Sequence, residues 1–224
     1  MTRTTNARVA GFMFLFYIVV GLTHLYLSNQ ATSGAEGSAA KLASMAQHAT
    51  LVRLTVVLAL LEAVSAVVLA VALYGLTRDV DHDLAIMALS FRVGEGVTNA
   101  ISTVKTLAML SIATAAAGAA TPDAVAQAVG GVLLKVGVGG SGAFLFSVGS
   151  TIYSYLFLRA RSIPVWLAWL GVFASILLVL LQPAQLAGFL KGPVTTFMWM
   201  PMLVFEVTLA VWLLIKGVAT PATR

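Results

Sequence analysis

The 224-residue chain contains no cysteine, and only 9% of its residues are charged. The missing thiols exclude disulfides, thiolate metal ligands and cysteine nucleophiles. The low charge content excludes an ordinary soluble domain, in which about 25% of residues carry a charge. Apolar residues instead make up 60% of the chain, and its mean hydropathy is +0.99. The composition therefore indicates an integral membrane protein.

Clustered basic residues and clustered histidines are also absent. The 13 lysines and arginines give a formal net charge of +5, but they lie scattered at the ends of hydrophobic segments. Nucleic acid is therefore not an expected partner. The three histidines lie far apart in the sequence, and a lone histidine is poor support for haem or a metal. We expect no metal site and no cofactor, and we expect an ordinary interfacial role for His24.

Six hydrophobic segments are long enough to cross a membrane, since a spanning helix needs about 20 apolar residues. Their continuous apolar runs favour helices over the alternating pattern of a membrane β-barrel. The segments are residues 9–27, 51–77, 84–117, 139–158, 164–181 and 194–215. We predict an all-α fold, a polytopic integral membrane helical bundle of six transmembrane helices that forms a single domain over residues 1–224.

Local features refine this six-helix plan. The first segment is longer than the apolar core of a signal peptide, about 15 residues at most, and no clean cleavage site follows it, so we expect a retained transmembrane helix. Thr121-Pro122-Asp123 is typical of a helix start and predicts a short outer-surface helix near residues 122–136. We interpret residues 28–50 as a long outer loop. Pro201 should kink the last helix or free a backbone carbonyl.

Lysine and arginine at the segment ends predict the orientation, because cytoplasmic loops are enriched in them. With a cytoplasmic N-terminus, seven basic residues fall on the cytoplasmic side and five on the other. The seven are Arg3, Arg8, Arg78, Arg159, Arg161, Lys216 and Arg224. This difference favours a multi-pass protein with both termini in the cytoplasm.

The third segment carries charges where the membrane should be most apolar. At 1.5 Å per helical residue, Arg92 and Glu95 lie roughly 12 and 17 Å from its cytoplasmic end, near the middle of a core about 30 Å thick. Lys105 reaches the outer edge, where its side chain can extend to water. Arg92, Glu95, Asn99 and Ser102 recur at spacings of three, four and three residues. They form a polar stripe that should face the bundle interior or a water-filled cavity.

Two further glutamates are expected at a similar depth. Glu206 lies ten residues before Lys216, and Glu62 lies about 16 Å from the outer end of the second segment. Three carboxylates around one arginine would leave net negative charge where an uncompensated ion costs several kcal/mol. We expect one or two carboxyls to be protonated, or a cation or cationic ligand to lie among them. The arginine should pair with Glu206 or Glu95, since a guanidinium suits bidentate carboxylate contacts.

The charged cluster supports three hypotheses. In the first, a pocket lined by Arg92, Glu95, Asn99, Glu206 and Glu62 binds or translocates a proton, a cation or a small amphipathic ligand. In the second, the protein is a membrane-embedded enzyme on a lipid or isoprenoid substrate, with a glutamate as general acid. In the third, the cluster only fixes helix register in a structural subunit of a larger membrane complex. We expect the lipid bilayer as a partner throughout, with membrane-complex partners or a second copy of the chain as further candidates.

Several loose motifs extend over most of the chain, from about Arg8 to Gly217. They are Arg8 before the first helix, Arg92-x-x-Glu95 in the third, Arg161-Ser162 with Pro164 to Leu167 after the fourth, and Glu206 with Trp212, Leu213, Lys216 and Gly217 at the end. Together they resemble the bacterial membrane family catalogued as domain of unknown function 4386. Val165 departs from the pattern, in which we expect a basic residue after the proline. The resemblance implies a multi-pass protein of the bacterial cell membrane and no particular reaction.

Overall fold

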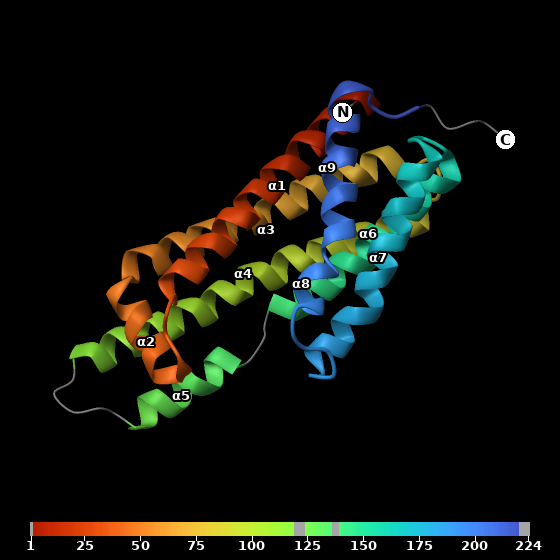
Figure 1. Cartoon of the computed structure of the whole chain (residues 1–224). Coiled ribbons are helices and arrows are strands. Elements are labelled where there is room, and N and C mark those ends of the chain that lie inside the picture. The colour runs from red at the N-terminus through yellow and green to blue at the C-terminus, as the bar shows by residue number, and fades with distance from the viewer. Residues whose placement is uncertain (1, 119–123, 136–138, 220–224) are drawn as a thin grey trace.

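The structure is a computed structural model that describes residues 2–118, 124–135 and 139–219. These residues form nine helices and no strand (Figure 1). The helices are α1 (Arg3–Ala31), α2 (Gly37–Gln47), α3 (Ala49–Thr77), α4 (His82–Gly118), α5 (Ala124–Lys135), α6 (Gly139–Ala160), α7 (Val165–Leu186), α8 (Val194–Phe197) and α9 (Met200–Ile215).

Six helical segments are long and apolar enough to cross a membrane: α1, α3, α4, α6, α7 and the combined α8–α9 segment. The predicted all-α bundle with six transmembrane helices is therefore confirmed, whereas the single-domain organisation stays a prediction. α1 begins at Arg3, six residues before the predicted limit, because the Thr2 hydroxyl caps it by accepting the Thr5 N–H at 3.1 Å. α7 continues to Leu186, five residues beyond its predicted end at 181.

The last crossing segment is broken rather than kinked. α8 ends at Phe197 and α9 begins at Met200, so Pro201 lies in the first turn of α9. Proline fits this position because the first N–H groups of a helix have no partner within it. Pro201 therefore lies at the start of a new helix instead of kinking a continuous one.

The crossing helices form a closed ring. α1 packs on α3, α3 on α4, α4 on α6, α6 on α7, α7 on α9, and α9 on α1. Two of these contacts need glycine for close approach: a Cβ atom added at Gly11 would lie 2.7 Å from the Ala210 carbonyl oxygen, and one at Gly96 would lie 3.0 Å from that of Ala63. The ring brings α1, α4 and α9 around one interior, although they are far apart in the sequence.

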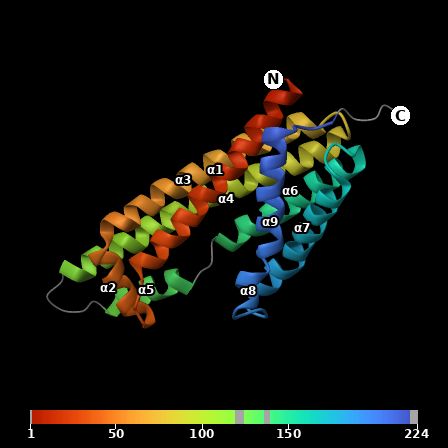
Figure 2. The same cartoon turned by 45° about the horizontal axis from the view of Figure 1, so that its top comes forward.

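The ring opens toward one end. α1, α3 and α4 run side by side, and α9 is inclined to them (Figures 1 and 2). Arg3 and Ala219 meet at the opposite end, where Nη2 of Arg3 donates a hydrogen bond to the Ala219 carbonyl at 3.4 Å. We call this the terminal end and the other the distal end. α1 and α9 approach each other near the terminal end and separate toward the distal end (Figure 1).

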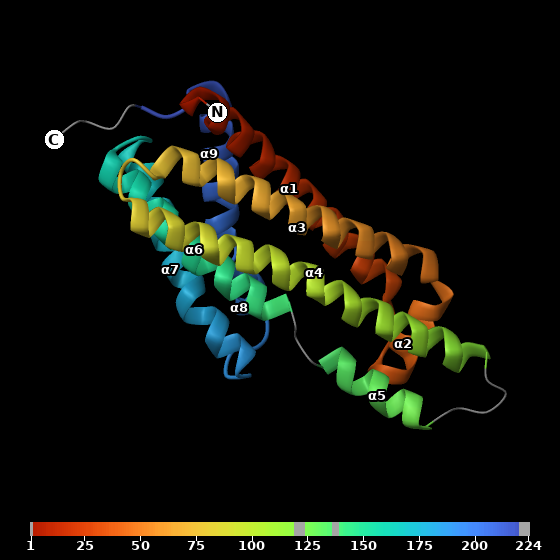
Figure 3. The ribbon, with the colours of Figure 1, turned by 180° about the vertical axis from the view of Figure 1, so that it is seen from behind.

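Two helices at the distal end are too short to cross a membrane. α2 and α5 pack on each other and on α4 (Figure 3). Leu42 and Met45 of α2 are buried there in an apolar cluster. The interpretation of residues 28–50 as a loop is therefore wrong for α2. The predicted short helix is confirmed as α5, and its expected start at residues 121–123 lies outside the described residues.

Polar contacts hold the terminal end together. Asp81, between α3 and α4, accepts the Leu84 backbone N–H at 3.1 Å and contacts the Arg159 guanidinium at 2.7 Å. The Leu84 N–H and then the Arg159 group lower the pKa of Asp81, because both favour its charged form. The Ala219 N–H donates to the Ser162 carbonyl at 3.0 Å. The cytoplasmic orientation of this end stays a prediction.

Candidate functional site

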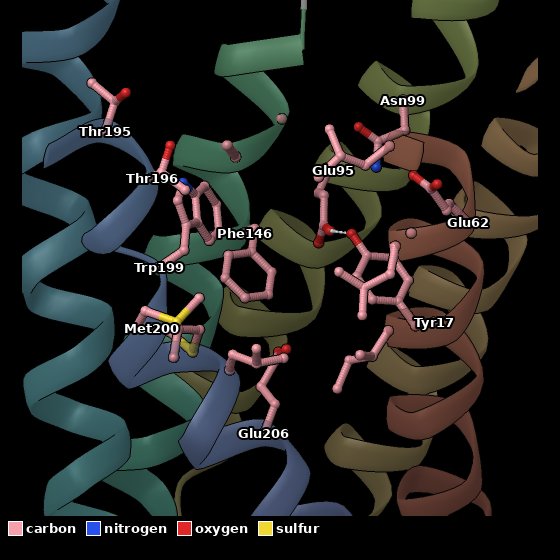
Figure 4. A pocket seen from close by; sticks show the side chains of 18 residues that line it. Tyr17, Glu62, Glu95, Asn99, Phe146, Thr195, Thr196, Trp199, Met200 and Glu206 are labelled. Carbon is pink, nitrogen blue, oxygen red and sulfur yellow. Dashed lines mark hydrogen bonds between the residues drawn. The ribbon is translucent and has the colours of Figure 1, made fainter. Parts of the chain in front are cut away.

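Three glutamates from three different helices line one cavity inside the ring (Figure 4). The cavity has a volume of about 520 Å³ and lies between α1, α3, α4, α6 and the α8–α9 segment. Glu62 of α3, Glu95 and Asn99 of α4, and Glu206 of α9 all line it. Arg92 lines a smaller adjoining pocket together with Glu206. The structure thus brings all five predicted site residues to one region of the bundle.

Arg92 lies beside the cavity and pairs with Glu95. Its Nη1 lies 2.7 Å from Oε2 of Glu95, one turn away on α4, and both residues are only 1% exposed. Of the two predicted partners, Glu95 therefore forms the ion pair. The guanidinium carbon lies 4.6 Å from the ring centre of Phe146 and 5.9 Å from that of Tyr17. Two aromatic faces therefore add to the stabilisation of the buried charge.

The guanidinium of Arg92 still has unused hydrogen-bonding capacity. Its Nε, Nη1 and Nη2 find no hydrogen-bond acceptor among the described residues, because the short contact with Glu95 lacks the angles of a hydrogen bond. The adjoining pocket measures about 10 Å³ and is also lined by Ser150 and Ser154. That volume is close to what one water molecule requires. The pocket therefore offers room for a polar atom between Arg92 and Glu206.

Glu95 has a second partner on α1. The hydroxyl of Tyr17 donates a hydrogen bond to its Oε1 at 2.8 Å (Figure 4). Both carboxyl oxygens of Glu95 are thus engaged, one by Tyr17 and the other by Arg92. Tyr17 was not among the predicted site residues. The available signal was a hydroxyl in the middle of an apolar helix, because a buried tyrosine usually finds a hydrogen-bond partner.

Glu62 is engaged by a histidine of α1. Nδ1 of His24 lies 2.8 Å from Oε1 of Glu62, and the two side chains are 30% and 13% exposed. The expected interfacial role of His24 stays a prediction, to which the structure adds this contact with Glu62. The three carboxyls thus share the site with one arginine and one histidine.

Glu206 differs from the other two glutamates because no described residue forms a hydrogen bond or an ion pair with it. Glu206 is 6% exposed, and it lines both the cavity and the small pocket beside Arg92. The carboxyl group points toward the cavity interior (Figure 4). A buried carboxylate in this position requires compensation by a proton, a ligand or the nearby guanidinium.

Three aromatic residues also line the cavity. Trp199 stands beside Phe146, with ring centres 6.0 Å apart, and Tyr17 lies on the other side of the cavity (Figure 4). None of the three belonged to the predicted site, since aromatic residues are common in transmembrane helices. Aromatic faces attract cations and also cover apolar groups. Together with the carboxyls, this lining favours a ligand that combines positive charge with an apolar part.

The cavity reaches the side of the bundle between α1 and the α8–α9 segment. Leu22, Leu25 and Met200 line it and are also 54%, 58% and 46% exposed. Side chains that both line a cavity and reach the surface mark the rim of an opening. This rim is mostly apolar, although the exposed Thr196 also lies on it, and it lies where α1 and α9 separate.

The sequence matches a family model described as "Domain of unknown function (DUF4386)" over residues 9–217. The chain belongs to this family. The resemblance seen in the sequence motifs is thereby confirmed, and the match includes every residue of the cavity. No curated protein and no solved structure matches the chain. Membership of DUF4386 supplies no reaction, so a function has to be derived from the cavity.

The carboxyls of this DUF4386 protein do not converge on one point. Within the described part of the chain, no three His, Asp or Glu side chains are grouped as ligands of a metal ion. Glu62, Glu95 and Glu206 lie at different places around the cavity (Figure 4). Such a spread suits separate contacts with a molecule that occupies the space between them.

Proposed function

We propose that this DUF4386 protein binds a small amphipathic cation in the cavity, with Glu206 as the counter-ion. The environment of Glu206 carries the proposal: its carboxyl is buried, has no hydrogen bond or ion pair with any described residue, and faces a cavity of about 520 Å³. A bound cation neutralises the carboxylate, and the rings of Phe146 and Trp199 cover its apolar part.

The other polar groups orient the ligand and maintain the cavity. Glu95 is engaged by Tyr17 and Arg92, and Glu62 is engaged by His24, so neither carboxyl has to change its partner when a cation binds. Within this proposal the bound cation is then translocated or sensed. The protein acts in the bacterial cell membrane with its terminal end in the cytoplasm.

Tetraphenylphosphonium is a suitable probe because it is an apolar cation, and tetraphenylborate is an anion of matching shape. Binding is measured by calorimetry on the full chain in lipid nanodiscs, with protein-free nanodiscs as the background. We expect saturable binding of the phosphonium only, and at least tenfold weaker binding for Glu206→Gln, which corresponds to about 1.4 kcal/mol. Glu36→Gln, at an exposed acid outside the cavity, is the matched control and leaves the affinity unchanged. Absence of saturable binding, or equal affinities for wild type and Glu206→Gln, refutes the proposal.

Gly21 allows the cavity to be filled without removing any charged group. A Cβ atom added there would meet only Oε1 of Glu62, at 4.0 Å, so the position tolerates a side chain at its first carbon and borders the cavity that a leucine would fill. We expect this variant to lose phosphonium binding and to keep the wild-type melting temperature. Gly118→Leu is the control, since a Cβ atom there meets nothing within 4 Å. Normal binding by Gly21→Leu would locate the phosphonium outside the cavity.

The mostly apolar rim favours a second candidate function, catalysis on a lipid or isoprenoid substrate. An opening with such a rim admits a lipid chain, and Glu206 beside Arg92 would act as general acid. The test is incubation of the protein with bacterial lipid extract, followed by mass spectrometry. A product that accumulates with wild type and not with Glu206→Gln supports the enzyme. If the lipid composition is unchanged and phosphonium binding is intact, the enzyme hypothesis is rejected.

A further inference from the structure

The surroundings of Glu206 leave its charge unbalanced when the cavity holds no cation. The small pocket that it lines is bordered by the apolar side chains of Phe14, Phe205 and Leu209, and also by Arg92, Ser150 and Ser154. The carboxyl group has no hydrogen-bond donor among the described residues. An ionised carboxylate is poorly solvated in such a place, whereas a protonated carboxyl is tolerated.

The nearby arginine does not remove this imbalance. Arg92 lies 2.7 Å from Glu95, so the charge of one guanidinium is already matched by one carboxylate. An ionised Glu206 would bring the net charge of these three groups to −1. A protonated Glu206, or an ionised Glu206 with a bound cation, keeps their sum at zero.

The remaining titratable groups around the cavity have other partners. The Tyr17 hydroxyl donates to Glu95, and the Tyr153 hydroxyl donates to the Ala70 carbonyl at 3.0 Å. On the α3 side, Glu62 lies against His24. Each of these groups can keep its hydrogen bond when a cation occupies the cavity. Glu206 is therefore the acid whose protonation state has to respond to the ligand.

We infer that Glu206 exchanges one proton for the bound cation. Without ligand the carboxyl group holds a proton. When the cation binds, the carboxyl O–H bond breaks, the proton leaves to bulk water, and the carboxylate becomes the counter-ion. This inference rests on the proposed function and adds its regulation: acid competes with the cation for one carboxyl group. Translocation through such a site exchanges protons for cations.

The test counts protons during phosphonium binding to the full chain in nanodiscs. Calorimetry in phosphate and in Tris buffer gives the number released, because the two buffers differ in their enthalpy of protonation. Below the midpoint of the exchange we expect one proton per phosphonium, and fewer above it. We also expect the apparent Kd to rise about tenfold for each pH unit below the midpoint of the exchange. Glu206→Asp retains the release, whereas the residual binding by Glu206→Gln is independent of pH.

Variants of the His24–Glu62 pair test whether these residues, rather than Glu206, release the proton. Glu62→Gln and His24→Gln should still release one proton per phosphonium, since the inference assigns the exchange to Glu206. Release that is lost in either variant and persists in Glu206→Gln overturns the inference and assigns the exchange to the His24–Glu62 pair. Phosphonium binding without proton release at any pH overturns the exchange and leaves the proposed function intact. Absence of phosphonium binding overturns both.

Discussion

Replacing Arg92 by methionine would leave the Glu95 carboxylate buried with only the Tyr17 hydroxyl as its partner. Methionine preserves most of the apolar stem, which packs so closely on Gly149 that a Cβ atom there would lie 2.9 Å from Cγ of Arg92. The loss is therefore mainly electrostatic. Removing one member of a buried ion pair costs about 3–5 kcal/mol. Because the Arg92 N–H groups lack hydrogen-bond acceptors among the described residues, we expect the lower end, about 3 kcal/mol.

A double-mutant cycle measures this interaction. Glu95→Gln leaves the guanidinium unpaired and should also lower the free energy of unfolding by about 3 kcal/mol. Arg92→Met/Glu95→Gln removes both charges, so it should cost at least about 2 kcal/mol less than the sum of the single variants. The assay is reversible unfolding by sodium dodecyl sulfate in mixed micelles, followed by circular dichroism.

An exposed ion pair with the same separation serves as the control for this cycle. Asp81 and Arg159 also lie 2.7 Å apart, but their side chains are 28% and 49% exposed. Their cycle should show much weaker coupling, because solvent screens the charges. If the effects of Arg92→Met and Glu95→Gln simply add, the two groups are not energetically paired. The charge balance inferred around Glu206 would then be wrong.

Three further variants test other contacts. Gly11→Ala places a Cβ atom 2.7 Å from the Ala210 carbonyl oxygen, so it should lower the free energy of unfolding by about 1–3 kcal/mol; wild-type stability in the detergent titration would show that α1 and α9 are not in close contact. Tyr17→Phe removes the hydrogen bond to Glu95 and should cost about 1.5–3 kcal/mol in the same assay; a neutral result would deny that bond. Asp81 has a lowered pKa in the folded protein, so its contribution is present above the unfolded pKa of about 3.9 and is lost as pH falls through the folded value. Asp81→Asn should therefore melt below wild type at neutral pH, with the difference shrinking in acid, and a difference independent of pH would contradict this account.

The helices and the shared face of Arg92 and Glu95 could be predicted because both depend on patterns along the chain. A continuous apolar run defines a crossing helix whatever it packs against. The three-residue spacing of Arg92 and Glu95 places them on one face of α4 before any neighbour is known. For the same reason, the sequence predicted that Glu62 and Glu206 would lie at a similar depth.

The contacts between helices could not be predicted in this way. Tyr17 and His24 become part of the site only because α1 turns their side chains toward α4 and α3, and that rotation depends on the packing of the whole ring. α2 was missed because it buries only Leu42 and Met45, which is too weak a pattern to distinguish an 11-residue helix from a loop. The unpaired state of Glu206 is a three-dimensional property with no counterpart in the sequence.

The unequal lengths of the helices connect this cavity to the thickness of the bilayer. α4 has 37 residues and the α8–α9 segment has 22, which correspond to about 55 and 33 Å at 1.5 Å per residue. A hydrocarbon core about 30 Å thick accommodates the longer helices by tilt, and a thinner core demands more tilt. Shorter lipid chains should therefore incline α1, α3 and α4 further from α9 and widen the opening between α1 and α9. Lipid chain length is therefore expected to change access to Glu206 through helix tilt, independently of charge.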